Sequence, residues 1–128
     1  MRHLLSAPGR WADFGKWRVA ASSELLEIEC HRALDRLRLE REVNDLELSE
    51  LKIDLAQLIA SIDIIAMNRD IVALAKGSFP TIVKSLDAIH VASALLWQKN
   101  HADVAILSHD KSMLTLAAAL NFKTIGQT

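Results

Sequence analysis

Two stretches decide the fold, Ser85-Leu-Asp-Ala-Ile-His-Val-Ala-Ser-Ala-Leu and Ile106-Leu-Ser-His-Asp110. The first places Asp87 in the opening turn of an apolar-faced helix, with Ser85 as its expected N-cap. The second places Asp110 directly after an apolar strand and directly before another helical pattern. In an open α/β sheet, ligand and metal sites gather beyond the carboxyl ends of the strands. Two carboxylates delivered to that edge predict a site for a hard divalent cation, Mg²⁺ or Mn²⁺.

The rest of the chain alternates helices with short strands. Helices are expected over residues 10–17, 23–40, 44–61, 68–77, 85–100 and 110–120, and strands over residues 18–22, 62–67, 102–107 and 123–126. Ser22 or Ser23 is the expected cap of the second of these helices, and Asn44 with Glu47 has the spacing of a capping box. Strands that alternate with helices predict a parallel sheet covered by helices on both faces.

Composition indicates one globular domain spanning residues 1–128, with 51% hydrophobic and 24% charged residues. The charge is nearly balanced, 15 Lys and Arg against 16 Asp and Glu, which excludes a uniformly basic nucleic-acid-binding surface. Residues 71–128, however, carry five lysines against three acids. Contact with nucleic acid would therefore come from a local patch.

The sequence also restricts cofactor chemistry and location. A single cysteine, Cys30, cannot form an internal disulfide, which favours the cytoplasm, and we expect its thiol to be buried and inert. The five histidines do not have zinc-binding spacing. No apolar run reaches membrane-spanning length, so no membrane partner is expected.

Glu29 is the third candidate acid, because it lies in the middle of the 23–40 helix at the edge of the apolar stripe. Each acid also has a purely structural interpretation: Asp110 as an N-cap, Asp87 as a partner of the helix dipole and Glu29 as a solvated helix residue. Buried like charges repel unless a cation is present, so convergence of all three would predict a bound metal.

Four other residues are secondary candidates near the acids. His90 lies one turn after Asp87 and either reaches the site or packs at a helix interface. Ser108 either orients a water or is a simple turn hydroxyl. Lys84 and Lys111 either meet phosphate or are solvated.

These motifs resemble those of a known family. Ser85-Leu-Asp-Ala-Ile-His-Val-Ala resembles the signature helix of PIN-domain nucleases, and Ser108-His-Asp-Lys-Ser-Met-Leu with Ala117-Ala-Ala-Leu-Asn-Phe resembles their last acidic motif. Residues 21–36 are similar to the segment that carries the second acid, placed here at Glu29 with Glu27 as the alternative. Order and spacing resemble those of small bacterial VapC-like toxins.

The resemblance implies a three-layer α/β/α sandwich with a parallel central sheet. It implies RNA cleavage with Mg²⁺ or Mn²⁺ held by Glu29, Asp87 and Asp110, with Ser108 beside them. It also implies a homodimer that is silenced by a cognate VapB-like antitoxin.

The chain departs from the family pattern at its start. Family members open with an apolar strand that ends in an Asp, the first metal ligand. This chain opens with Met1-Arg-His-Leu-Leu, which resembles the helix after that strand. We therefore expect a domain without its first strand and first acid, through a late start codon or a truncated gene product.

Two functions follow as expectations. The first is a metal-dependent endoribonuclease, the toxin of a toxin-antitoxin pair. The alternative is a catalytically impaired PIN-like protein that binds or dimerises but lacks one metal ligand. A phosphatase of similar topology would need an Asp-x-Asp loop or a Gly-rich turn, and neither occurs in the sequence.

Overall fold

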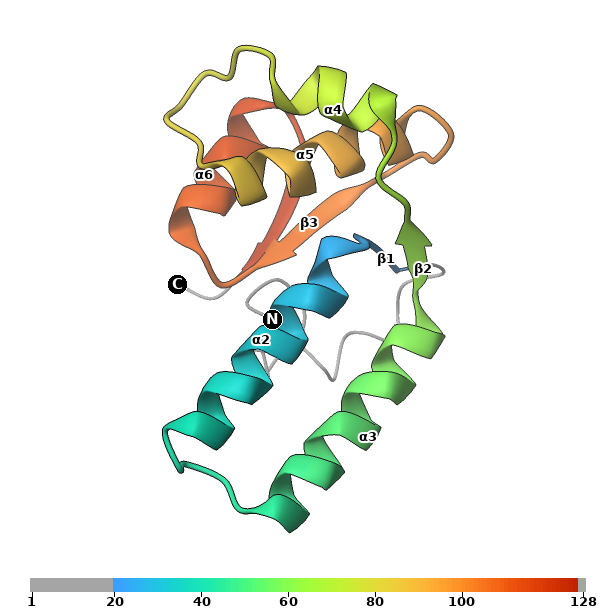
Figure 1. The fold of residues 1–128 in the computed structure, drawn as a ribbon. Coiled ribbons are helices and arrows are strands. Elements are labelled where there is room, and N and C mark those ends of the chain that lie inside the picture. Colours follow the sequence, from blue (N-terminus) through green and yellow to red (C-terminus); the bar gives the residue numbers. More distant parts are fainter. Residues whose placement is uncertain (1–19, 127–128) are drawn as a thin grey trace.

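In the computed structural model, which describes residues 20–126, one or two helices follow each strand before the next strand begins (Figure 1). The helix expected over residues 10–17 lies outside this range. The described elements are β1 (Ala21–Ser23), α2 (Leu25–Leu39), α3 (Asp45–Ser61), β2 (Asp63–Ile65), α4 (Arg69–Ala75), α5 (Ser85–Gln98), β3 (Ala105–Ser108), α6 (Lys111–Ala119) and β4 (Lys123–Gly126).

The described strands pair in parallel, as the alternation of elements predicts. β1 pairs with β2, with Ser22 opposite Ile64, and β3 pairs with β4, with Ser108 opposite Gly126. These pairs form two separate two-stranded sheets within residues 20–126. The mixed α/β class with parallel strands is confirmed, while the described residues do not join the strands into one continuous central sheet.

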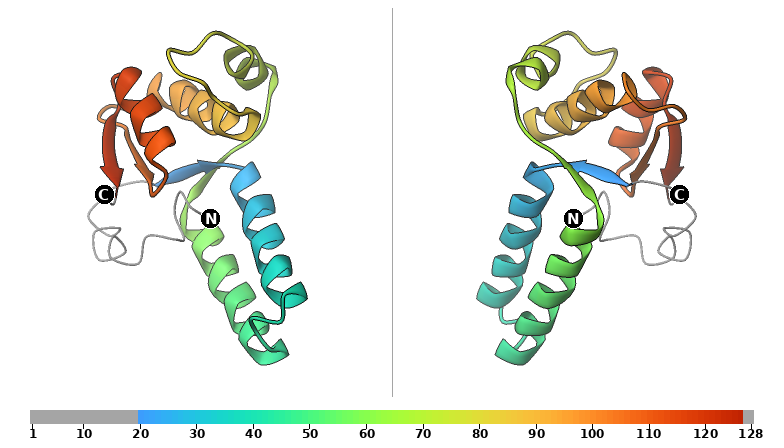
Figure 2. Two further views of the ribbon diagram at one scale, coloured as in Figure 1. Left: turned by 90° about the vertical axis from the view of Figure 1, so that its left-hand side faces the viewer. Right: turned by 90° about the vertical axis from the view of Figure 1, so that its right-hand side faces the viewer.

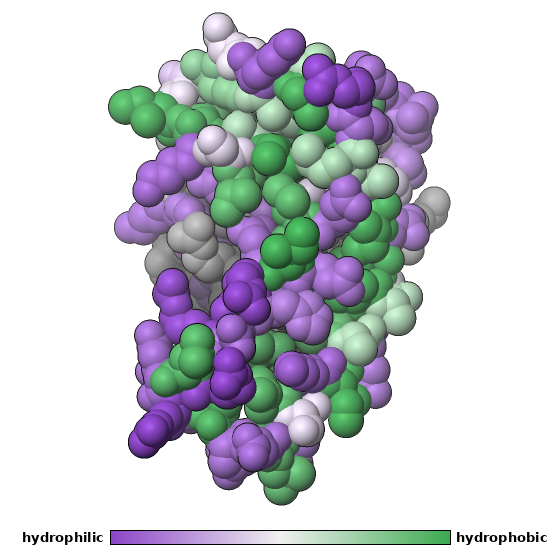
Figure 3. All heavy atoms as spheres, viewed as in Figure 1, coloured by the Kyte–Doolittle hydropathy of each residue, from purple (hydrophilic) through white to green (hydrophobic). Residues whose placement is uncertain are grey.

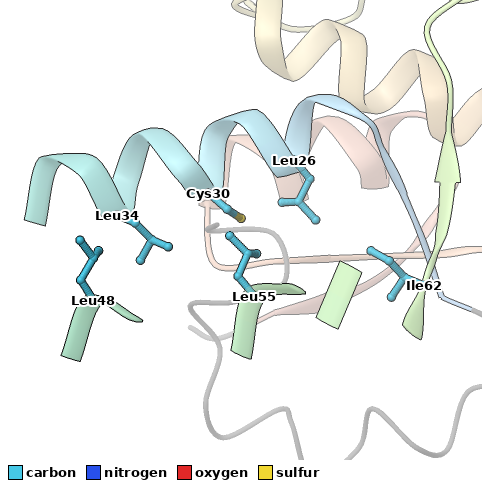
Figure 4. Packing of buried hydrophobic residues seen from close by; sticks show 6 residues of the cluster. All are labelled: Leu26, Cys30, Leu34, Leu48, Leu55 and Ile62. Carbon is cyan, nitrogen blue, oxygen red and sulfur yellow. The ribbon is translucent and has the colours of Figure 1, made fainter. Parts of the chain in front are cut away.

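A helical hairpin of α2 and α3 projects from the rest of the described chain (Figures 1 and 2). Its core is a cluster of six buried apolar residues, drawn in Figure 4: Leu26, Cys30, Leu34, Leu48, Leu55 and Ile62. The α2 members recur every four residues and the α3 pair is seven residues apart, so each helix turns one apolar stripe toward the other. Burial of these stripes holds the hairpin together.

A second cluster packs α5 against α6, around Val91, Met113 and Leu116. Two adjacent residues of β3 pack against different clusters: Leu107 against the first and Ile106 against the second. Successive side chains of a strand point to opposite faces. Strand β3 therefore has helical residues packed on both of its faces.

Local side-chain caps define most of the described helix starts. Asn44 forms the expected capping box, in which its side chain accepts from the Glu47 amide at 2.8 Å and the Glu47 carboxylate accepts from the Asn44 amide at 3.0 Å. The Asn68 side chain caps α4 by accepting from the Ile71 amide at 2.9 Å. These interactions satisfy backbone donors that have no partner within the helix.

Two expected caps are wrong in detail. The N-cap position of α5 is Lys84, which makes no side-chain cap, and Ser85 is already helical. The N-cap position of α2 is Glu24, although Ser23 Oγ still accepts from the Leu25 amide at 3.2 Å. Preference for a cap residue is a statistical tendency, and the backbone path from the preceding strand or loop fixes the actual start.

Apolar residues are also exposed on the outer side of the hairpin. Leu46 and Ile53 of α3 are 69% and 58% exposed, one heptad apart and away from the buried Leu48 and Leu55. In Figure 3, apolar atoms are visible over β2 and along α3 between polar side chains. None of the helices within residues 20–126 has the length and apolar character needed to span a bilayer.

Candidate functional site

Asp87 lies in the first turn of α5 and is partly exposed. A carboxylate here interacts favourably with the positive end of the helix dipole. Helix α5 packs against β1, the strand that leads directly into α2. This packing brings the amino end of α2 toward α5.

Glu29 and His90 are in contact where these two helices meet. Oε1 of Glu29 and Nε2 of His90 form a hydrogen bond between residues 61 positions apart in the sequence. The His90 side chain is 10% exposed and that of Glu29 is 24% exposed, so the pair is largely shielded from water. His90 lies one turn beyond Asp87, and residues at this spacing share a helix face. The fold therefore brings Glu29 to the helix that carries Asp87.

Ser108 and Asp110 form a second pair, at the junction of β3 and α6. The Asp110 amide donates to Ser108 Oγ at 3.0 Å, and Ser108 is fully buried. Oδ1 of Asp110 accepts from the Ser112 amide at 2.9 Å, which confirms the N-cap interpretation. A carboxylate has about four acceptor sites, so capping by itself does not exclude a ligand at Asp110.

Gly126 packs against the carbonyl of Ser108. A Cβ atom at Gly126 would lie 2.7 Å from the Ser108 carbonyl oxygen and 2.3 Å from Leu114 Cδ1. Replacing Gly126 with Ala is therefore expected to destabilise the chain by about 1–3 kcal/mol, because backbone and core must shift. Urea unfolding followed by circular dichroism measures the change.

Gly77 is the matched control for this substitution. A Cβ there would meet the carbonyl oxygens of Leu74 at 3.2 Å and of Ala73 at 4.0 Å, and the residue is exposed. Gly77→Ala should change the free energy of unfolding by less than about 1 kcal/mol. Equal effects of the two substitutions would contradict the role given to Gly126.

The sequence interpretation did not single out Glu24 or His109. The Glu24 carboxylate accepts from the Met67 amide at 2.7 Å, which ties the start of α2 to the segment after β2. His109 lies between Ser108 and Asp110, and its Nε2 atom is buried without a hydrogen-bond partner in the described part of the chain. No local pattern identifies the Glu24 contact, because its partner is 43 residues away. The sequence could have pointed to His109 only through its position between Ser108 and Asp110.

Cys30 is buried beside Glu29, as expected. Burial raises the pKa of its thiol, and the negative charges of Glu29 and Glu27 raise it further. A thiol with a raised pKa has little reactive thiolate at neutral pH. Cys30 therefore acts as a packing residue of the hairpin.

The donor set fits a hard divalent cation by its chemistry, because carboxylate oxygens are the ligands that Mg²⁺ and Mn²⁺ prefer. Residues 20–126 contain no group of three or more His, Cys, Asp or Glu side chains placed to hold a metal ion. The meeting of Glu29, Asp87 and Asp110 around one cation thus stays a prediction. Lys84 and Lys111, at the starts of α5 and α6, are exposed.

Comparison with known proteins identifies no relative. No family model, curated protein or solved structure matches the chain.

Proposed function

We propose that this protein is a metal-dependent endoribonuclease of the PIN-like type, acting as the toxin of a toxin-antitoxin pair. The contact of Glu29 with His90 carries the proposal, because it connects two acidic segments that are distant in the sequence. Asp110 is contributed by the next strand-to-helix junction, beside buried Ser108. Packing of helical residues on both faces of β3 supports the three-layer arrangement implied by the family resemblance.

In this proposal Glu29, Asp87 and Asp110 would hold Mg²⁺ or Mn²⁺. When bound, such an ion lowers the pKa of a coordinated water and offsets charge that develops on the phosphate. His90 holds the carboxylate of Glu29 in place through its Nε2 atom. Ser108, through its contact with the Asp110 amide, helps to fix the start of α6.

The reaction is hydrolysis of an RNA phosphodiester. A water oxygen attacks phosphorus in line with the leaving 3′ oxygen, the P–O3′ bond breaks, and the leaving oxygen takes a proton. The products carry a 5′-phosphate and a 3′-hydroxyl. Lys84 and Lys111 would contact neighbouring phosphates, and single-stranded or looped RNA is the expected substrate.

The alternative is a catalytically impaired PIN-like protein that dimerises or holds a VapB-like antitoxin. The exposure of Leu46 and Ile53 on α3 favours it, because exposed apolar side chains at heptad spacing are typical of a surface that contacts another chain. This alternative needs neither metal nor RNA.

A metal titration separates the two functions. Mn²⁺ is added to the purified protein in a calorimeter, and thermal unfolding is followed in parallel with a labelled single-stranded RNA cleavage assay. The nuclease predicts heat of binding, a raised melting temperature and cleavage that EDTA stops. Absence of heat, of stabilisation and of cleavage would reject the nuclease in favour of the binding protein.

A further inference from the structure

One face of α2 carries basic residues in line with Glu29. Glu29, Arg32 and Arg36 follow at spacings of three and four residues. At 3.6 residues per turn these side chains lie on the same face of the helix. Arg32 and Arg36 therefore follow Glu29, the acid that contacts α5, along one face of α2.

Arg32 and Arg36 differ in their ion pairing. Arg32 is paired with Asp35 at 3.2 Å, and its side chain is 71% exposed. Asp35 also binds Arg38 at 2.9 Å. Arg36 is exposed and forms no ion pair within the described residues 20–126. Its planar guanidinium is thus available to a ligand from solvent.

We propose that Arg36, assisted by Arg32, binds phosphates of single-stranded RNA next to the phosphate that is cleaved; this inference rests on the proposed nuclease function. Arg36 is seven residues from Glu29, which corresponds to roughly 10 Å along the helix axis. Extended RNA that places one phosphate at the acids would then carry its neighbours along this face of α2.

The chemistry of the two side chains favours phosphate as the ligand. A guanidinium presents paired N–H donors that match two phosphate oxygens, and it remains charged at all relevant pH values. Glu40, one turn beyond Arg36, is exposed and carries a negative charge that repels phosphate. The basic face therefore spans Arg32 and Arg36 and ends there.

The test substitutes Arg36→Gln and measures binding of a labelled unstructured RNA by fluorescence anisotropy over a range of salt concentrations. EDTA is present throughout, so that no cleavage occurs. We expect the affinity to fall about threefold to tenfold and the slope of log K against log salt to become shallower by about 0.7, the value for one lost phosphate contact on a single strand. In cleavage assays with Mg²⁺, KM should rise while kcat stays unchanged.

Two further variants complete the design. Arg38→Gln is the matched control, because Arg38 lies about 200° around the helix from Arg36, and it should leave RNA affinity unchanged. Arg36→Lys keeps the charge and should restore the salt slope but only part of the affinity.

The outcomes separate this inference from the function on which it rests. If wild type binds and cleaves RNA but Arg36→Gln behaves like Arg38→Gln, the RNA-binding role of Arg36 is wrong and the nuclease stands. If wild type neither binds nor cleaves RNA, the nuclease proposal fails and this inference fails with it.

Discussion

Replacing Asp87 with Asn is expected to lower Mg²⁺-dependent RNA cleavage by more than about 100-fold, because loss of groups that only support a metal ligand already costs 10–100-fold. The substitution keeps the size of the side chain and removes its charge. Asp87 lies in the first turn of α5, one turn before the histidine that binds Glu29. Cleavage of a labelled single-stranded RNA, measured against Mg²⁺ concentration, gives the result.

Stability should change little in this variant. The lost interaction with the dipole of α5 is worth about 0.3–1 kcal/mol, so the protein should remain folded and its melting temperature should fall slightly. Asp103→Asn is the matched control: Asp103 is exposed and forms a 3.3 Å ion pair with Lys123. Its positive φ of 55° is one that Asn accepts as readily as Asp. Retention of wild-type cleavage by Asp87→Asn would remove Asp87 from the site.

Replacing Leu26 with Ala should destabilise the protein by about 2–5 kcal/mol, because the deleted side chain leaves a cavity as well as losing burial. Leu26 is fully buried in the cluster that joins α2 to α3 (Figure 4). For a chain of this size the melting temperature should fall by roughly 10 °C. Chemical and thermal unfolding, monitored by circular dichroism, measure both quantities.

Ile28→Ala provides the comparison on the same helix. Ile28 is 59% exposed and stands two residues from Leu26, so the same kind of truncation leaves no buried cavity. We expect a change within about 0.5 kcal/mol. Similar decreases in the free energy of unfolding for Leu26→Ala and Ile28→Ala would show that α2 does not pack on α3 as described.

The sequence predicted features that depend on interactions between residues close together in the chain. It could not predict those that depend on contacts between distant segments. The capping box of Asn44, the cap of Asn68 and the cap of Asp110 were all predictable, because donor and acceptor lie within three residues of each other. The apolar stripe of Leu26, Cys30 and Leu34 follows from helical periodicity. The Ser85 cap was wrong because the path of residues 76–84 places Lys84 at that position.

For the candidate site too, the sequence predicted the local features and missed the contacts between distant segments. The sequence identified Glu29, Asp87, Ser108 and Asp110 as candidates, and it placed Asp87 and Asp110 at helix starts. It left open whether His90 reaches the site or packs at a helix interface, and it gave no sign that His90 binds Glu29 or that Glu24 binds the Met67 amide. Those contacts depend on how α5 and β2 approach α2, which no neighbouring residue specifies.

The sequence by itself thus determined the order of the elements, their apolar faces and most of their caps, because these depend on interactions between residues a few positions apart. Only the tertiary structure decided that the described strands pair as two separate parallel sheets, that β3 is packed on both faces, and that His90 meets Glu29. These features join segments far apart in the chain. Their geometry is set by the packing of whole helices, where burial of apolar surface outweighs any local preference.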